Sequence, residues 1–179
     1  MTAPHETAPG LADAVAGLGA VLDHPAVAAR RIRDLLPLYR DLLGGVFHLG
    51  GDNLRVGYRG IQLRYPDGTR IELLEPLAGS TFLDSFFRRS PAGGLHHVTF
   101  RVPSLRTALA ALADRGYGVT GQYEDEAYWQ EVFIHPREAF GTLVQLAQAG
   151  PGYGPPPGLT LDDVLAGRGS PHGSGVPSP

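Results

Sequence analysis

The chain has 179 residues, a net charge of −3 and 42% hydrophobic residues, enough for one domain with a hydrophobic core. It contains no cysteine, and all 15 basic residues are arginine. Disulfides, thiol nucleophiles, Schiff-base lysines and phosphate-loop lysines are therefore excluded. The sequence shows no basic excess, no apolar run approaching about 20 residues and no secretory pattern, so we expect no nucleic-acid or membrane partner and a cytoplasmic location.

The first half of the chain is expected to form one structural unit, residues 21–77, after a flexible arm at residues 1–20 that is rich in Ala, Gly and Thr. Its order is predicted to be a strand, a helix and three strands, at residues 21–28, 34–43, 46–49, 54–65 and 69–75. The buried face of the helix is predicted from apolar side chains at helical spacing: Leu35, Leu38, Tyr39 and Leu42.

The second half is expected to repeat this order in residues 93–149, after a connector at residues 78–92 with a short helix. Strands are predicted near residues 95–102, 118–123, 128–135 and 142–147, with a helix that starts from an N-cap at Ser104 and ends at Gly116. Half of residues 150–179 are Gly or Pro. We expect a disordered tail there, with at most one helical turn at residues 161–166.

An internal repeat supports this division. His24 and His97 lie 73 residues apart in similar segments. The same offset places residues 68–73 on residues 141–146, where glycine, threonine, a β-branched residue and leucine recur in register. Several matches at one offset indicate a duplicated supersecondary unit.

Strand alternation assigns the polar residues of the repeat to faces, because neighbouring strand residues point to opposite sides. Glu72 lies between Ile71 and Leu73, which are expected to face a core, so Glu72 is expected to face a cavity. His97 lies on the mixed face of its strand and is expected to share that cavity. His96 lies on the apolar face and is expected to be structural.

At this point the chain resembles the vicinal oxygen chelate superfamily, which includes glyoxalases, bleomycin resistance proteins and extradiol dioxygenases. The resemblance is strongest to its methylmalonyl-CoA epimerase-like members and covers about residues 21–149. The motifs that carry it lie at residues 22–24, 71–77, 94–97 and 133–136. It implies an α+β fold in which two tandem βαβββ modules form a half-open barrel around a divalent metal ion.

The resemblance also implies the ligands of that ion: His24, Glu72, His97 and Gln145. This ligand set suits Co, Ni, Zn, Fe or Mn and leaves positions for a substrate with two vicinal oxygens. Glu72 and Gln145 are the expected catalytic positions. Family epimerases carry a glutamate where this chain has Gln145, and an amide cannot exchange a proton in that role. A base must then come from one of four residues: Glu72, Asp52, Glu131 or His135.

The leading hypothesis is an isomerase or lyase that stabilises the enolate of a carbonyl compound. The resemblance to the epimerases suggests a coenzyme A thioester as the substrate. Four arginines are candidates for a carboxylate or phosphate clamp: Arg55, Arg59, Arg64 and Arg70. One alternative is an Fe(II) dioxygenase that uses two histidines and one carboxylate. The other is a drug-sequestering binding protein with a stacking surface of Tyr123, Tyr128 and Trp129. We further expect a homodimer.

Overall fold

The structure is a computed structural model that describes residues 17–124 and 128–169, so most of the expected N-terminal arm lies outside the described residues. Within the described residues no helix is both long and apolar enough to cross a bilayer. The elements in chain order are β1 (Val21–Ala28), the short helices η2 (Ile32–Asp34) and η3 (Pro37–Leu42), β2 (Val46–Asn53), β3 (Tyr58–Arg64), β4 (Arg70–Pro76), α1 (Asp84–Arg89), β5 (Gly94–Arg101), α2 (Leu105–Asp114), β6 (Val119–Tyr123), β7 (Trp129–Ile134), β8 (Leu143–Ala149) and α3 (Leu161–Leu165).

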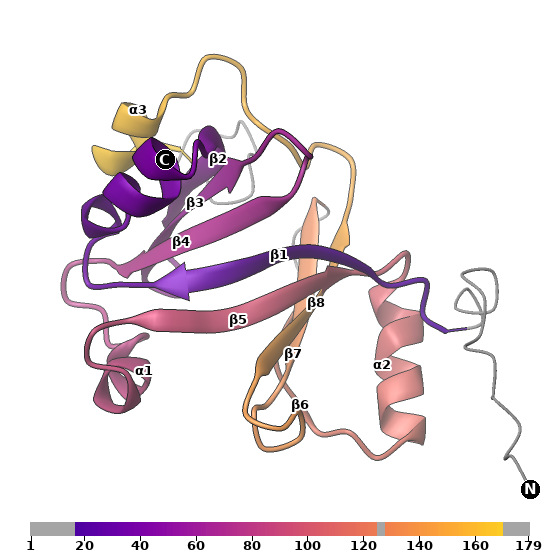
Figure 1. Ribbon diagram of the computed structural model, residues 1–179. Helices are drawn as coiled ribbons and strands as arrows, with labels where there is room; N and C mark the ends of the chain where they lie inside the picture. Colours follow the sequence, from indigo (N-terminus) through magenta and orange to yellow (C-terminus); the bar gives the residue numbers. More distant parts are fainter. Residues whose placement is uncertain (1–16, 125–127, 170–179) are drawn as a thin grey trace, which may run out of the picture.

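The eight strands of the described residues form one sheet in the order β2-β3-β4-β1-β5-β8-β7-β6. The first strands of the two halves, β1 and β5, pair antiparallel at the centre, and each also pairs in parallel with the last strand of its own half. The sheet curls into a half-barrel, with α2 beside β7 and β8 and α3 beside β2 (Figure 1). The α+β half-barrel expected from the resemblance is confirmed.

The register of the sheet confirms the internal repeat. In the first half, Ala26 of β1 pairs with Glu72 of β4. In the second half, Thr99 of β5 pairs with Gln145 of β8. Both partners of the second pair lie 73 residues after those of the first, so the two parallel ladders are equivalent. Glu72 and Gln145 therefore occupy matching positions on the two sides of the barrel.

Two local predictions in the first half were wrong. The expected helical face fails because the segment is a 3₁₀ turn followed by a π-helix, whose periods differ from 3.6 residues. As a result Ile32 and Leu36 are buried, while Leu38 and Leu42 are exposed. The strand expected to begin at residue 54 begins at Tyr58. Asn53 Oδ1 accepts a hydrogen bond from the backbone N–H of Val56 at 3.0 Å, and this bond forms a turn before the strand.

Residues 150–169 pack on the sheet instead of forming the expected disordered tail, and the helical turn expected at residues 161–166 is present as α3. Thr160 and Asp163 form a reciprocal capping box at the start of α3. Val164 is fully buried in a cluster with Ile32 and Ile61 on the outer face of the first half. Composition alone missed this because the few apolar residues of the segment find a distant apolar surface to cover.

Candidate metal centre

A cavity of about 620 Å³ lies between the two halves of the sheet. Its lining includes all four predicted ligands: His24, Glu72, His97 and Gln145. Each of these side chains belongs to one of the four central strands β4, β1, β5 and β8, and each is buried. The repeat therefore delivers one polar side chain per central strand to a single enclosed space.

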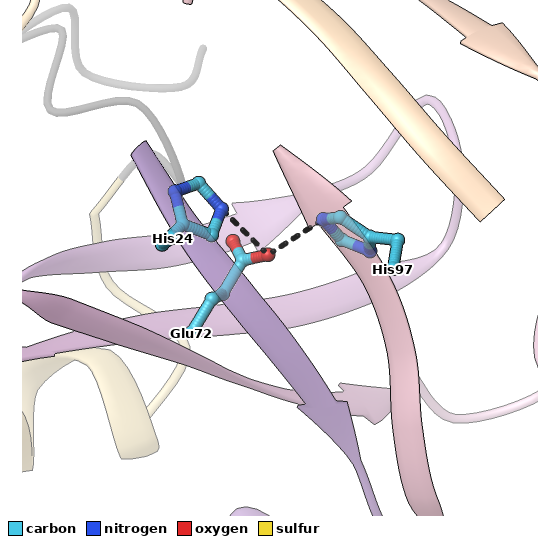
Figure 2. Close-up of side chains that lie close together, drawn as sticks. All are labelled: His24, Glu72 and His97. Carbon is cyan, nitrogen blue, oxygen red and sulfur yellow. Dashed lines mark ion pairs between the residues drawn. The ribbon is translucent and has the colours of Figure 1, made fainter. Parts of the chain in front are cut away.

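Three of the four residues converge on one point. Glu72 Oε2 lies 3.5 Å from His24 Nε2 and 3.4 Å from His97 Nε2 (Figure 2). One ligand atom from each residue lies within 4.8 Å of the others. Ligands at the usual distance of about 2.1 Å from a tetrahedral ion are separated by about 3.4 Å, so the observed spacing fits a metal ion.

The protonation of His97 and of Glu72 also fits a metal. Burial lowers the pKa of His97 to about 3, so its imidazole is neutral, as a ligand must be. His97 Nε2 is buried and has no hydrogen-bond partner among the residues that the structure describes, which is costly unless something else occupies its lone pair. Burial opposes ionisation of Glu72, but the hydrogen bond and charge of His24 lower its pKa overall. The donor set suits Zn, Fe, Co, Ni or Mn.

Two β-bulges set the directions of these side chains. In the pairing of β1 with β5, Asp23 and His96 are the extra residues that have no partner on the opposite strand. A bulge re-aims side chains next to it and cancels strict alternation. The prediction that His96 faces a core was therefore wrong. His96 lines the cavity, and its Nδ1 lies 2.9 Å from Nδ1 of His97. Burial lowers the pKa of His96 to about 4.

The bulged Asp23 supports His24. Its carboxylate is fully buried, and Oδ2 accepts from His24 Nδ1 at 2.7 Å. The other oxygen forms ion pairs with Arg70 and with Arg101, the latter at 2.5 Å. With one proton held on Nδ1, Nε2 faces Glu72 and is the nitrogen that a metal ion can bind once Nε2 loses its own proton, and a carboxylate on Nδ1 is the usual support of a metal-bound histidine. Sequence reasoning missed Asp23, although an aspartate directly before the repeat histidine was visible.

Burial opposes protonation of His24, but its hydrogen bonds to Asp23 and Glu72 raise its pKa to about 9. The pKa of Asp23 is lowered, because His24 and the two arginines outweigh the effect of burial. This part of the site therefore carries a tightly paired negative and positive charge. A metal ion that binds His24 must displace a proton from Nε2.

Gln145 lies on the cavity wall, but both ends of its amide have protein partners. Its Oε1 accepts from Thr99 Oγ1 at 2.5 Å, and its Nε2 donates to Glu131 Oε2 at 2.6 Å. Thr99 Oγ1 in turn lies 3.2 Å from His24 Nε2. His24, Glu72 and His97 converge without Gln145, so the role of Gln145 as a ligand stays a prediction.

Two of the four candidate bases are buried: Glu72, which belongs to the cluster of His24, Glu72 and His97, and Glu131 on β7, which lies outside that cluster. Its Oε2 accepts from Trp129 Nε1 at 2.9 Å as well as from Gln145, and Arg55 lies 3.4 Å from Oε1. Burial raises the pKa of Glu131. His135 lines the exposed rim of the cavity. Asp52 was a wrong candidate, because it is not among the cavity-lining residues and forms a bidentate pair with Arg59 beside α3.

The expected arginine clamp and aromatic surface do not form as sets. Arg55 alone of the four arginines lines the cavity, and its guanidinium lies 3.7 Å from the ring centre of Tyr123. Arg70 instead holds Asp23. Of the three aromatic residues, only Trp129 lines the cavity.

Comparisons with known proteins agree with this architecture. A family model described as the Glyoxalase/Bleomycin resistance protein/Dioxygenase superfamily matches residues 23–133. The ethylmalonyl-CoA/methylmalonyl-CoA epimerase of Cereibacter sphaeroides is 33% identical over 130 residues, which cover 71% of this chain and 96% of that protein. The mitochondrial methylmalonyl-CoA epimerase of Mus musculus is 29% identical over 132 residues, 72% of either chain. The solved structure of the Mycobacterium tuberculosis methylmalonyl-CoA epimerase is similar with a TM-score of 0.65 at 26% identity, covering 73% of this chain and 88% of that one.

Proposed function

Because the chain is an enzyme that belongs to the glyoxalase/bleomycin resistance protein/dioxygenase superfamily, we propose that it is a metal-dependent epimerase of 2-alkylmalonyl-CoA thioesters. The observation that carries the proposal is the convergence of His24, Glu72 and His97 on one buried point, where Nε2 of His97 has no hydrogen-bond partner in the described part of the chain. The names of the relatives supply the substrate class.

The ligand cluster would hold a divalent ion, and the ion would bind two substrate oxygens and stabilise the enolate. The protein's own residues prepare the cluster for this task. Asp23 keeps the proton of His24 on Nδ1, and burial keeps His97 neutral. The buried lining limits the water that competes for the same position.

The proposal assigns Glu131 as the acid/base group. Position 145 carries an amide and cannot act as a base. On the neighbouring strand β7, Phe133 pairs directly with Gln145, and Glu131 lies two residues before Phe133, diagonally across from Gln145. Residues two apart on a strand share a face, and Glu131 lines the cavity. The Glu131 carboxylate takes the proton from the α-carbon and becomes the neutral acid, while the electron pair of the C–H bond enters the enolate. A solvent water donates a proton to the opposite face of that planar carbon, and the hydroxide that remains takes the proton held by Glu131, which completes the inversion and restores the carboxylate.

The test is exchange of the α-proton with solvent deuterium, followed by NMR on methylmalonyl-CoA and ethylmalonyl-CoA. The Co²⁺-loaded protein should catalyse exchange, and EDTA treatment should abolish it until metal is restored. His97→Ala should lose both metal and exchange, whereas His135→Ala, at the exposed rim, should keep its metal. If the metal-loaded protein exchanges the α-proton of neither thioester, the proposal is contradicted.

An Fe(II) dioxygenase is the second candidate, because two histidines and one carboxylate also form the ligand set of non-haem iron oxygenases. Substrate-dependent oxygen uptake by the Fe²⁺-loaded protein, measured with an oxygen electrode on catechols, would favour this candidate. The epimerase proposal expects deuterium exchange with no oxygen uptake.

A further inference from the structure

The segment after the double unit packs against the cavity-lining Trp129 before it reaches α3. Figure 1 shows it, in orange and yellow, running from the end of β8 to α3 beside β2. It is anchored at its far end by Val164 in the core and by Arg59, which donates to the carbonyl of Leu165 at 3.2 Å. Near its start, Tyr153 contacts both halves of the sheet.

The ring of Tyr153 faces the second half. It stacks on the indole of Trp129, with ring centres 4.8 Å apart and an angle of 27°. The Trp129 indole lines the cavity and donates to Glu131 Oε2. Tyr153 therefore packs against the side chain that holds the proposed base.

The hydroxyl of Tyr153 faces the first half, where it accepts from Arg70 Nη1 at 3.3 Å. The same nitrogen donates to Gln62 Oε1 at 3.2 Å, and the other terminal nitrogen of Arg70 pairs with the buried Asp23. Asp23 in turn binds Nδ1 of His24. Three successive polar contacts thus join the C-terminal segment to a ligand of the proposed metal.

We propose that Tyr153 is a positioning residue of the metal centre, and that residues 150–169 complete the site rather than only covering the sheet. The inference rests on the metal-binding part of the proposed function. Its physical basis is that a buried carboxylate such as Asp23 needs its cationic partner in a fixed place. The planar guanidinium keeps one orientation when its several N–H groups have acceptors. The Tyr153 hydroxyl and Gln62 are the acceptors that fix the side of Arg70 away from Asp23.

The two sides of Tyr153 can be tested separately in the full-length protein. Tyr153→Phe removes the hydroxyl and keeps the ring against Trp129. We expect it to weaken Co²⁺ affinity about threefold to tenfold, less than the roughly 10–100-fold typical of direct supports of metal ligands, because it acts one contact further away. The visible absorption of bound Co²⁺ should shift, and exchange at saturating Co²⁺ should stay within about twofold of wild type.

Tyr153→Ala removes the ring as well and should lower both Co²⁺ affinity and exchange at saturating metal. The matched control is Tyr65→Phe, which also deletes a hydroxyl hydrogen bond, to the carbonyl of Tyr39 at 2.9 Å, but has no link to His24. It should bind Co²⁺ as the wild type does.

The outcomes separate this inference from the proposed function. Wild type that fails to bind Co²⁺ overturns both. Wild type that binds Co²⁺, with Tyr153→Phe equal to it in affinity and absorption, overturns the role of Tyr153 alone. An equal loss of affinity in Tyr65→Phe also overturns it, because the effect would then be general destabilisation. If Tyr153→Ala does not fold, the Phe variant still decides.

Discussion

Glu131→Gln is the substitution that bears most directly on the chemistry. The amide has nearly the same shape as the carboxylate, and its carbonyl oxygen can accept from both Trp129 and Gln145, as Oε2 does now. The NH₂ group of the glutamine then faces the Arg55 guanidinium, so two hydrogen-bond donors point at each other. Because the Arg55 side chain is 47% exposed, it can turn to solvent, and loss of such a pair costs at most about 1 kcal/mol.

The effect on catalysis should be far larger than the effect on folding. Removing a general base typically slows a reaction about 10²- to 10⁴-fold, which corresponds to about 3–5 kcal/mol of activation free energy. The ligand cluster of His24, Glu72 and His97 is untouched. We therefore expect normal Co²⁺ content, a melting temperature within about 3 °C of wild type, and deuterium exchange reduced at least 100-fold.

The assay is α-proton exchange on methylmalonyl-CoA at saturating Co²⁺, with metal content and melting temperature measured on the same samples. Glu138→Gln is the matched control, since it makes the same change at an exposed position of the β7–β8 connection. Exchange by Glu131→Gln within about threefold of wild type, with metal bound, would show that another group removes the proton.

Three further variants test the surroundings of the site. Asp23→Asn keeps the shape but removes the charge that supports His24, so Co²⁺ affinity should fall about 10–100-fold by titration; wild-type affinity would contradict that support. Gln145→Glu replaces the amide that donates to Glu131 at 2.6 Å with a second buried carboxylate, which should cost about 2–4 kcal/mol of unfolding free energy at pH 7. Repulsion raises the folded-state pKa of one carboxyl, so this loss should shrink as pH falls through that raised pKa toward about 4.5, the ordinary value of a glutamate in the unfolded chain; calorimetry showing equal losses at pH 7 and at about pH 4.5 would argue against the contact. Val164→Ala should cost about 1–3 kcal/mol in urea unfolding, and no change would mean that α3 does not pack.

The sequence by itself determined the architecture and the positions of the candidate ligands. A repeat with one constant offset required two equivalent units, and equivalent units place His24 opposite His97 and Glu72 opposite Gln145. Alternation along β4 then sent Glu72 to the inner face, because Ile71 and Leu73 had to face a core. These inferences depend on local periodicity and on matching positions, both of which are present in a single chain.

Only the tertiary structure decided what surrounds those ligands. The bulges at Asp23 and His96 arise from the pairing of β1 with β5, and no local pattern states where a ladder between distant strands gains an extra residue. The contact of Glu131 with Gln145 depends on the register of β7 with β8. Tyr153 reaches Arg70 and Trp129 because α3 covers an apolar surface on the other half of the molecule. Polar supports of this kind are selected by burial and by non-local packing, which appear only when the chain has folded.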